Sequence, residues 1–232
     1  MGHTGGVDVA VLVYDGVSGA EALAPHEVFR RAAGVDVVFV AQRPGPCVTQ
    51  GRPGLIRADR ALDDLRAPDV LVIPGGLGAH RVAAQPALRA WVADAHRTSQ
   101  WTASVSTGSL LLGAAGVLDG VDATGHWLAL GDLVGHGASP VAERLVVRGR
   151  IATASGAASA HDLALAVVDR CCGREVADRV RGSFAPGGDE GGRRRPTIRL
   201  RRWGHHGRYT VDEPPPGDGR RCRRHPSASS SS

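Results

Sequence analysis

Short β-branched runs alternate with segments of helical composition along the first 180 residues, and this alternation restricts the fold more than any other feature. The runs VDVAVLVY (7–14), VDVVFVAQ (35–42) and DVLVIPGG (69–76) have the length of buried strands. In QPALRAWVADAHR, Pro86 suits a first helical turn, and the apolar residues that follow fall on one face. The pattern predicts an α/β fold in which helices cover both faces of a mostly parallel sheet.

The pattern continues after residue 100. WTASVSTGSLLLGAAGVL (101–118) predicts a fourth strand and then a helix, whose apolar residues recur at helical spacing. DATGHWLAL (122–130) and ERLVVRGRIATAS (143–155) are strand-like, and a last helix carries an apolar stripe that ends at Cys171. The Gly-Arg-Pro-Gly centre of 47–65 suits a small hairpin. In such sheets, ligands bind beyond the carboxyl ends of the strands.

The composition changes near residue 183, which predicts one domain over 1–183 and a disordered tail rich in Arg, Gly, Pro and Ser over 184–232. Within the tail, 198–211 is expected to form a short ordered piece. The tail holds 11 Arg against 5 acidic residues, so it accounts for the net charge of +5. Nonspecific nucleic-acid binding by this tail is one interpretation, and a solvated tail is the other. Specific DNA binding is not expected, because the 49 residues of the tail do not show the helical pattern of a helix-turn-helix region.

The chain shows no membrane-spanning run and no secretory signal, which predicts a cytoplasmic protein without membrane contact. The four cysteines lack paired CxxC spacing, so reduced structural thiols are expected. No HxxxH or HxH spacing supports a metal site, and no cofactor is predicted.

Ser106 lies where the fourth predicted strand meets its helix, with Ser104 two residues before it and Gly108 two after. A nucleophile elbow needs small residues at these spacings, because the sharp turn brings their backbones close together. A helix that begins at Thr107 also presents free N–H groups to an anion. Ordinary turn packing is the alternative reading of the same residues.

Three further positions belong to the same predicted sheet edge. Gly76 ends the neighbouring strand, and its N–H together with that of Thr107 is a candidate oxyanion hole. Glu21 follows the first strand and is a candidate for proton transfer, or else a first-turn carboxylate that complements the helix dipole. His126 in ATGHW is the best placed of the ten histidines, either as a catalytic imidazole or as a structural one.

Taken together, these residues resemble the DJ-1/PfpI superfamily, of the class I glutamine-amidotransferase-like fold. The resemblance spans about residues 7–180 and rests on GAEALAPHEVFRRA, DVLVIPGGLGAHR, ASVSTGSLLLGAAGVLDG, ATGHW and ASGAASAHDLAL. It implies a flavodoxin-like α/β/α sandwich and a homodimer. Within the superfamily, the motifs of this chain are similar to those of isonitrile hydratase-type proteins and of the sensing domains of AraC-type regulators. It places the nucleophile at Ser106, the acid at Glu21, the imidazole at His126 and the oxyanion-hole amides at Gly76 and Thr107.

The relatives carry Cys where this chain has Ser106. A hydroxyl needs a base during attack, whereas a thiol is partly ionised near neutral pH. Ser106 is therefore a substitution in a binding protein, an engineered replacement or a working nucleophile. Two functions follow, both with a small-molecule ligand: hydration of an isonitrile to an N-substituted formamide, or a non-catalytic binding or regulatory module.

Overall fold

The structure, a computed structural model, describes residues 6–51, 54–65, 67–184, 200–203 and 208–211. Contacts divide the chain into two units, Met1–Ala185 and Pro186–Ser232. The second unit contains strands β12 (Leu200–Trp203) and β13 (Arg208–Val211), which pair antiparallel within the segment for which an ordered piece was expected. The rest of that tail lies outside the described residues, so its disorder stays a prediction.

A seven-stranded sheet in the order β10-β11-β7-β6-β1-β2-β5 forms the centre of the first unit. Its strands are β1 (Val7–Leu12), β2 (Val35–Ala41), β5 (Arg60–Ala61), β6 (Val70–Ile73), β7 (Trp101–Val105), β10 (Leu145–Arg148) and β11 (Ile151–Ala154). All neighbours pair in parallel except β10 and β11, which join antiparallel across a turn at Gly149. The predicted, mostly parallel sheet is confirmed, and β10 and β11 match the two strand-like pieces expected over 143–155.

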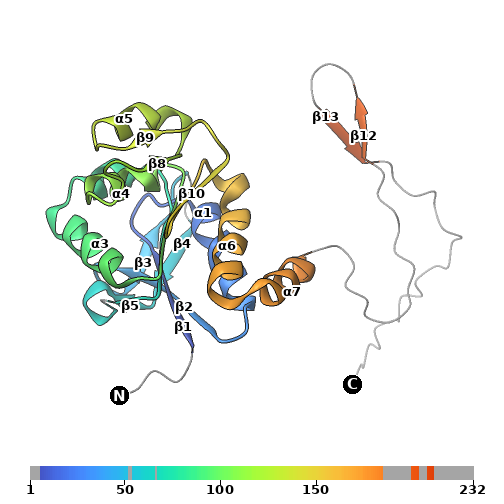
Figure 1. Cartoon of the computed structure of the whole chain (residues 1–232), viewed down its shortest axis with the longest axis horizontal. Helices are drawn as coiled ribbons and strands as arrows, with labels where there is room; N and C mark the ends of the chain where they lie inside the picture. The colour runs from blue at the N-terminus through green and yellow to red at the C-terminus, as the bar shows by residue number, and fades with distance from the viewer. Residues whose placement is uncertain (1–5, 52–53, 66, 185–199, 204–207, 212–232) are drawn as a thin grey trace, which may run out of the picture. The chain divides into compact units, whose positions relative to one another are not determined.

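Helices cover both faces of this sheet (Figure 1). On one face α1 (Gly19–Arg31) packs against α6 (Ala157–Cys172), which also contacts α7 (Arg174–Phe184). On the other face α2 (Ala79–Ala83) and α3 (Pro86–Thr98) pack against α4 (Gly108–Ala114). The three-layer α/β/α sandwich is thus present, and it buries β-branched and leucine side chains on both sides of the sheet.

Smaller elements complete the carboxyl edge of the sheet. The predicted hairpin is formed by β3 (Gly45–Val48) and β4 (Leu55–Ala58), while η1 (Leu62–Asp64) leads toward β6. At the far edge, β8 (Asp122–Ala123) pairs with β9 (Ser139–Pro140), and η2 (Trp127–Ala129) and α5 (Leu130–Val134) lie between them.

Two expectations about local structure are wrong. The strand-like run 122–130 forms only the two-residue β8. Its apolar residues then enter short helical turns, where Ala129 is 2% exposed while Trp127 and Leu128 are 73% and 67% exposed. The helix expected up to Leu118 ends at Ala114, where the Ala115 N–H closes the last turn. Val117 and Leu118 are still buried, so the spacing of these apolar residues indicated which side chains are buried but not where the helix ends.

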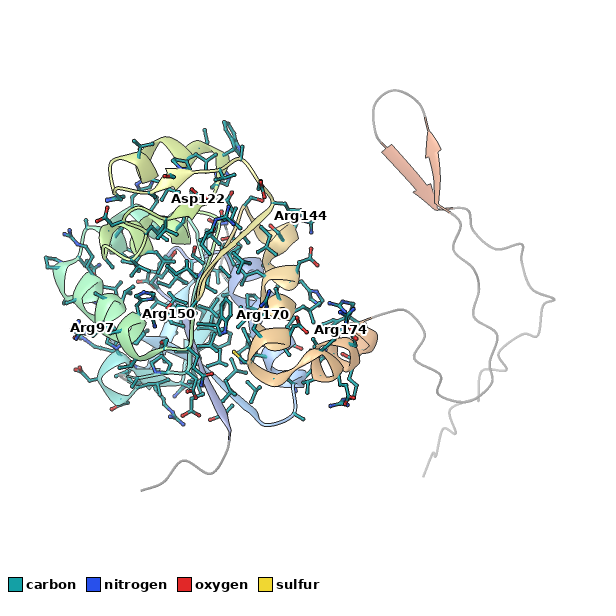
Figure 2. The ribbon with its side chains drawn as sticks, viewed as in Figure 1. Arg97, Asp122, Arg144, Arg150, Arg170 and Arg174 are labelled. Carbon is teal, nitrogen blue, oxygen red and sulfur yellow. The ribbon has the colours of Figure 1, made fainter. Side chains whose placement is uncertain are left out.

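Arg150, at the turn before β11, fixes the end of α3. Its guanidinium donates to the carbonyl oxygens of His96 and Ser99 in the region shown in Figure 2. A cation at a helix C-terminus satisfies carbonyl groups that have no partner within the helix. Burial and the Arg150 charge lower the pKa of His96, so this imidazole stays neutral. Its Nδ1 lies 2.8 Å from the Thr102 hydroxyl of β7, and this joins α3 to the strand that leads to Ser106.

Candidate active site

Strand β7 ends in a sharp turn at Ser106, immediately before α4. Ser106 has a φ of 57°, and no other described residue except glycines has a positive φ. This left-handed conformation costs about 1–2 kcal/mol for a residue with a Cβ. Its N–H donates to the Ala154 carbonyl oxygen at 2.7 Å, and the Ser109 hydroxyl donates to its carbonyl oxygen at 2.9 Å. These bonds hold the strand-to-helix elbow in its strained form.

Glu21 extends from the first turn of α1 toward this elbow. Its side chain is 7% exposed, and its Oε2 accepts the Gly75 N–H at 2.9 Å. Burial raises the pKa of Glu21, while hydrogen bonds from Gly75 and Ser106 act in the opposite direction. A carboxyl group whose pKa lies closer to neutrality is better suited to proton transfer than a solvated one. Glu21 also stands in the first turn of α1, where a carboxylate complements the helix dipole, so both interpretations of this residue stay open.

The two amides proposed as an oxyanion hole differ in whether their N–H groups already have a hydrogen-bond partner. The Gly76 N–H donates to Thr107 Oγ1 at 2.9 Å, so it already has a partner. The Thr107 N–H makes no hydrogen bond within the described part of the chain. It lies at the N-terminus of α4, whose free N–H groups favour negative charge. In this conformation, only the Thr107 amide is uncommitted.

His126 lies just before η2, and the preceding residue presses the loop against the elbow helix. A Cβ on Gly125 would lie 2.3 Å from Ser109 Oγ, which shows how closely the two segments approach. His126 Nδ1 accepts the Leu128 N–H at 3.3 Å. No hydrogen bond joins His126 to Ser106 among the described residues, so the imidazole borders the site without contacting the hydroxyl.

These side chains share one pocket of about 380 Å³. Sequence reasoning identified five of the residues that line it and missed the other five. The full lining is Glu21, Gln50, Gly76, Leu77, His80, Ser106, Thr107, His126, Leu128 and Ala129. Gln50 comes from the β3–β4 hairpin, and its Oε1 accepts the Leu77 N–H at 2.9 Å. Leu77 and His80 directly follow the PGG turn, a position that could have indicated them.

Tyr14 contacts the main chain next to the site, and sequence reasoning also missed this residue. It is buried, and its hydroxyl donates to the Pro74 carbonyl oxygen at 2.8 Å, next to the Gly75 amide that binds Glu21. Burial, followed by the Glu21 charge, raises the pKa of Tyr14 far above its ordinary value. The hydroxyl therefore remains a donor at neutral pH. Its position at the end of the first apolar run, on the same sheet edge as Ser106, is the signal that could have found it.

The described residues hold neither a metal-binding cluster nor a helix that could span a membrane. No group of three or more His, Cys, Asp or Glu side chains there could hold a metal ion. Among the same residues, no helix is both long and apolar enough to cross a membrane.

Comparison with known proteins identifies the family and the fold of this chain. The model of the DJ-1/PfpI family matches residues 7–170. The isonitrile hydratase of Pseudomonas putida is 29% identical over 174 residues, which cover 75% of this chain and 76% of the relative. The regulator CdhR of Pseudomonas aeruginosa is 31% identical over 57% of this chain, but the match covers only 40% of that protein.

Solved structures give the same fold. A ThiJ/PfpI family protein from Pseudomonas syringae superposes with a TM-score of 0.74 at 29% identity, covering 79% of this chain and 77% of that one. DJ-1 from Schizosaccharomyces pombe superposes with a TM-score of 0.68 at 22% identity, covering 78% of this chain and all of its own. The chain described here therefore belongs to the DJ-1/PfpI family.

Proposed function

We propose that the Ser106 pocket hydrates a small isonitrile to an N-substituted formamide. One observation carries this proposal: the buried carboxyl group of Glu21, held by the Gly75 amide, lines the same pocket as the strained elbow residue Ser106. Similarity to isonitrile hydratase over three quarters of the chain supports the choice of substrate. The apolar side chains of Leu77 and Leu128 border the pocket, where they suit the substituent on the isonitrile nitrogen.

The reaction needs one proton carrier and one oxygen nucleophile in each half. In the first, the Ser106 oxygen adds to the terminal isonitrile carbon, Glu21 accepts the hydroxyl proton, and the carbon receives a proton from the same carboxyl group. In the second, water adds to this carbon, and the bond from carbon to the Ser106 oxygen breaks. The nitrogen and the serine each end with a proton, and the product is the formamide. The Thr107 N–H is placed to stabilise negative charge on the added oxygen.

Turnover of cyclohexyl isocyanide, followed by chromatography of the formamide, tests these roles. We expect Ser106→Ala and Glu21→Gln each to lower kcat/KM by about 10³-fold or more, because members of a catalytic set act together. Ser139→Ala is the matched control, since Ser139 is exposed on β9 and does not line the pocket. Turnover that survives both site substitutions would contradict the proposal.

A non-catalytic ligand-binding module is the second candidate, and the hydroxyl at position 106 favours it. Without an imidazole in contact with Ser106, its oxygen is a weaker nucleophile than a thiolate. The similarity to part of the regulator CdhR is consistent with a sensing role. Activity that appears only in Ser106→Cys, together with thermal stabilisation of the parent by the isonitrile, would support this candidate over the enzyme.

A homodimer belongs to the same proposal, because exposed apolar side chains lie on the elements that contribute residues to the pocket. They come from α1, the β3–β4 hairpin, the β6–α2 loop and η2: Leu23, Val48, Leu55, Leu77, Trp127 and Leu128. The hairpin reaches the start of α1 through the Val17–Thr49 bridge and the β6–α2 loop through Gln50. Exposed apolar patches rimmed by polar residues are typical of protein interfaces. Light scattering should give a dimer for the parent and a monomer for Leu55→Lys.

We also infer a cytoplasmic location, which the thiols support. Cys47, Cys171 and Cys172 are free, and disulfides are rare in the cytoplasm. Cell fractionation with an antibody against the chain tests this location, and recovery outside the cytoplasmic fraction would overturn it.

A further inference from the structure

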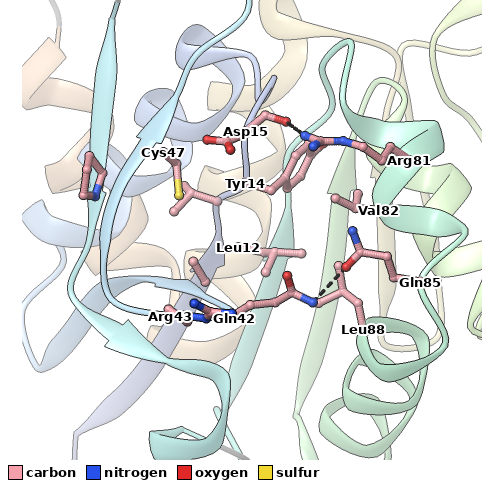
Figure 3. Close-up of a pocket in the computed structure, with 13 residues that line it drawn as sticks. Leu12, Tyr14, Asp15, Gln42, Arg43, Cys47, Arg81, Val82, Gln85 and Leu88 are labelled. Carbon is pink, nitrogen blue, oxygen red and sulfur yellow. Dashed lines mark hydrogen bonds between the residues drawn. The ribbon is translucent and has the colours of Figure 1, made fainter.

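A second pocket, of about 260 Å³, lies at the carboxyl ends of β1 and β2 and shares no lining residue with the Ser106 pocket (Figure 3). The buried side chains of Leu12, Val82 and Leu88 form an apolar surface in it. Cys47 adds its thiol to this surface. Burial, followed by the Asp15 charge, raises the pKa of Cys47, so the sulfur stays protonated and uncharged. One part of the pocket is therefore apolar.

Two oppositely charged side chains, Asp15 and Arg81, line this pocket. Arg81 Nη2 donates to the main-chain oxygen of Asp15 at 2.6 Å, and Asp15 Oδ1 accepts the Val48 N–H at 2.8 Å. These bonds fix both residues, as Figure 3 shows for the Asp15–Arg81 pair. Yet no ion pair within 4.0 Å joins either side chain to a charged group in the described residues. A guanidinium and a carboxylate thus face one pocket without neutralising each other.

The remaining polar groups make the pocket cationic and limit its length. Arg43 contributes a second guanidinium to the lining, so two positive groups stand against one negative group. Gln42 Nε2 donates to Gln85 Oε1 at 2.8 Å, and this amide pair closes one end (Figure 3). At 30 Å³ for each water molecule, the volume holds about nine water-sized groups. The space suits a compact ligand with an anionic group, a cationic group and a short apolar body.

We propose that this pocket binds an α-amino acid with an aliphatic side chain of leucine size. The amino-acid carboxylate pairs with Arg81, because a guanidinium matches carboxylate geometry with two parallel donors. The ammonium group pairs with Asp15, and the side chain packs on Leu12, Val82 and Leu88. This assignment does not depend on the reaction at Ser106, because the two pockets share no lining residue.

Calorimetric titration of the full chain with L-leucine tests the assignment. We expect 4-methylpentanoate, which lacks the ammonium group, and leucinamide, which lacks the carboxylate, each to bind about 10-fold or more weakly than leucine. Arg81→Gln and Asp15→Asn should each raise the leucine Kd by a similar factor. Asp15→Asn keeps a side-chain oxygen for the Val48 N–H, so it tests the charge rather than the loop.

Two controls separate this pocket from other causes. Arg97→Gln removes a guanidinium that is exposed on α3 and pairs with Asp94, so it should leave leucine binding unchanged. Ser106→Ala should also leave it unchanged, whatever its effect on turnover. The proposal is overturned if leucine gives neither heat nor a Tm shift at millimolar concentration. It is equally overturned if 4-methylpentanoate binds as well as leucine, or if Ser106→Ala abolishes binding while circular dichroism shows a folded protein.

Discussion

Gly75→Ala places one methyl group inside the contact between Glu21 and the elbow. The added Cβ would lie 2.7 Å from Glu21 Oε2, 2.7 Å from the Thr107 nitrogen and 2.6 Å from Thr107 Oγ1. The φ of Gly75 lies outside the left-handed region, so an alanine there meets steric conflict but no backbone strain. The substitution therefore measures how closely Glu21 and Thr107 pack around Gly75.

The expected cost follows from these distances. Ordinary contact begins at 3.4 Å, so each 2.7 Å neighbour must retreat by about 0.7 Å. The Thr107 nitrogen is main chain at the start of α4, and Glu21 is buried, so neither group yields freely. Overpacking of this kind costs about 1–3 kcal/mol, and each kcal/mol lowers the Tm of a domain of this size by about 2–4 °C.

Urea unfolding monitored by circular dichroism measures the loss, and isonitrile turnover measures the displacement of Glu21. Gly131→Ala is the matched control, because this α5 glycine has nothing within 4 Å of the added Cβ. The control should be neutral or up to about 1 kcal/mol more stable than the parent. A Gly75→Ala protein as stable and as active as the control would refute the reasoning.

Three further outcomes are expected. Because burial raises the folded-state pKa of Glu21, its stabilising contribution is complete below the unfolded pKa and is lost as pH rises through the folded pKa. In urea unfolding, the free energy of unfolding of the parent relative to that of Glu21→Gln should therefore rise as the pH is lowered from about 8 to about 5. A fall over the same range would contradict the raised pKa of Glu21. The free energy of unfolding of Ser106→Gly should be about 1 kcal/mol higher than that of Ser106→Ala, since glycine accepts a φ of 57° without strain. Equal urea midpoints for the two variants would show that the elbow is not strained. Trp91→Phe should cost about 0.5–1.5 kcal/mol in urea unfolding, because the Leu62 carbonyl loses the 2.9 Å bond from Trp91 Nε1 and keeps only the 3.3 Å bond from the Leu65 N–H. An unchanged midpoint would mean that this second bond suffices.

The main elements of the fold could be predicted from the sequence because buried strands and amphipathic helices leave strong periodic signals. The runs at 7–14, 35–42 and 69–76 became β1, β2 and β6. The prediction for 122–130 failed because this segment forms short helical turns, where neither helical nor strand spacing extends over enough residues to be distinguished. The edge strand β5 has only two residues, too few to carry a pattern.

The candidate site was predictable where residues follow strands and hidden where they come from loops. Ser106, Thr107 and Gly76 closely follow β7 and β6, and Glu21 lies in the first turn of the helix after β1. The structure brings these four residues to one pocket. Gln50 reaches that pocket from a hairpin whose placement depends on tertiary contacts. The state of the Gly76 amide, which bonds to Thr107 Oγ1, depends on a side-chain orientation that sequence spacing does not encode.

The close approach of three loops has a consequence for redesign of the pocket. Added Cβ atoms at Gly75, Gly76 and Gly108 would each meet main-chain atoms of a neighbouring loop, at 2.7, 2.2 and 2.1 Å respectively. The main-chain frame around Ser106 therefore has almost no freedom to evolve by substitution at these glycines. Selection for a new ligand is confined to replaceable side chains on the walls, chiefly Gln50, Leu77 and Leu128. A library randomised at those three positions would explore the reachable specificities while leaving the elbow intact.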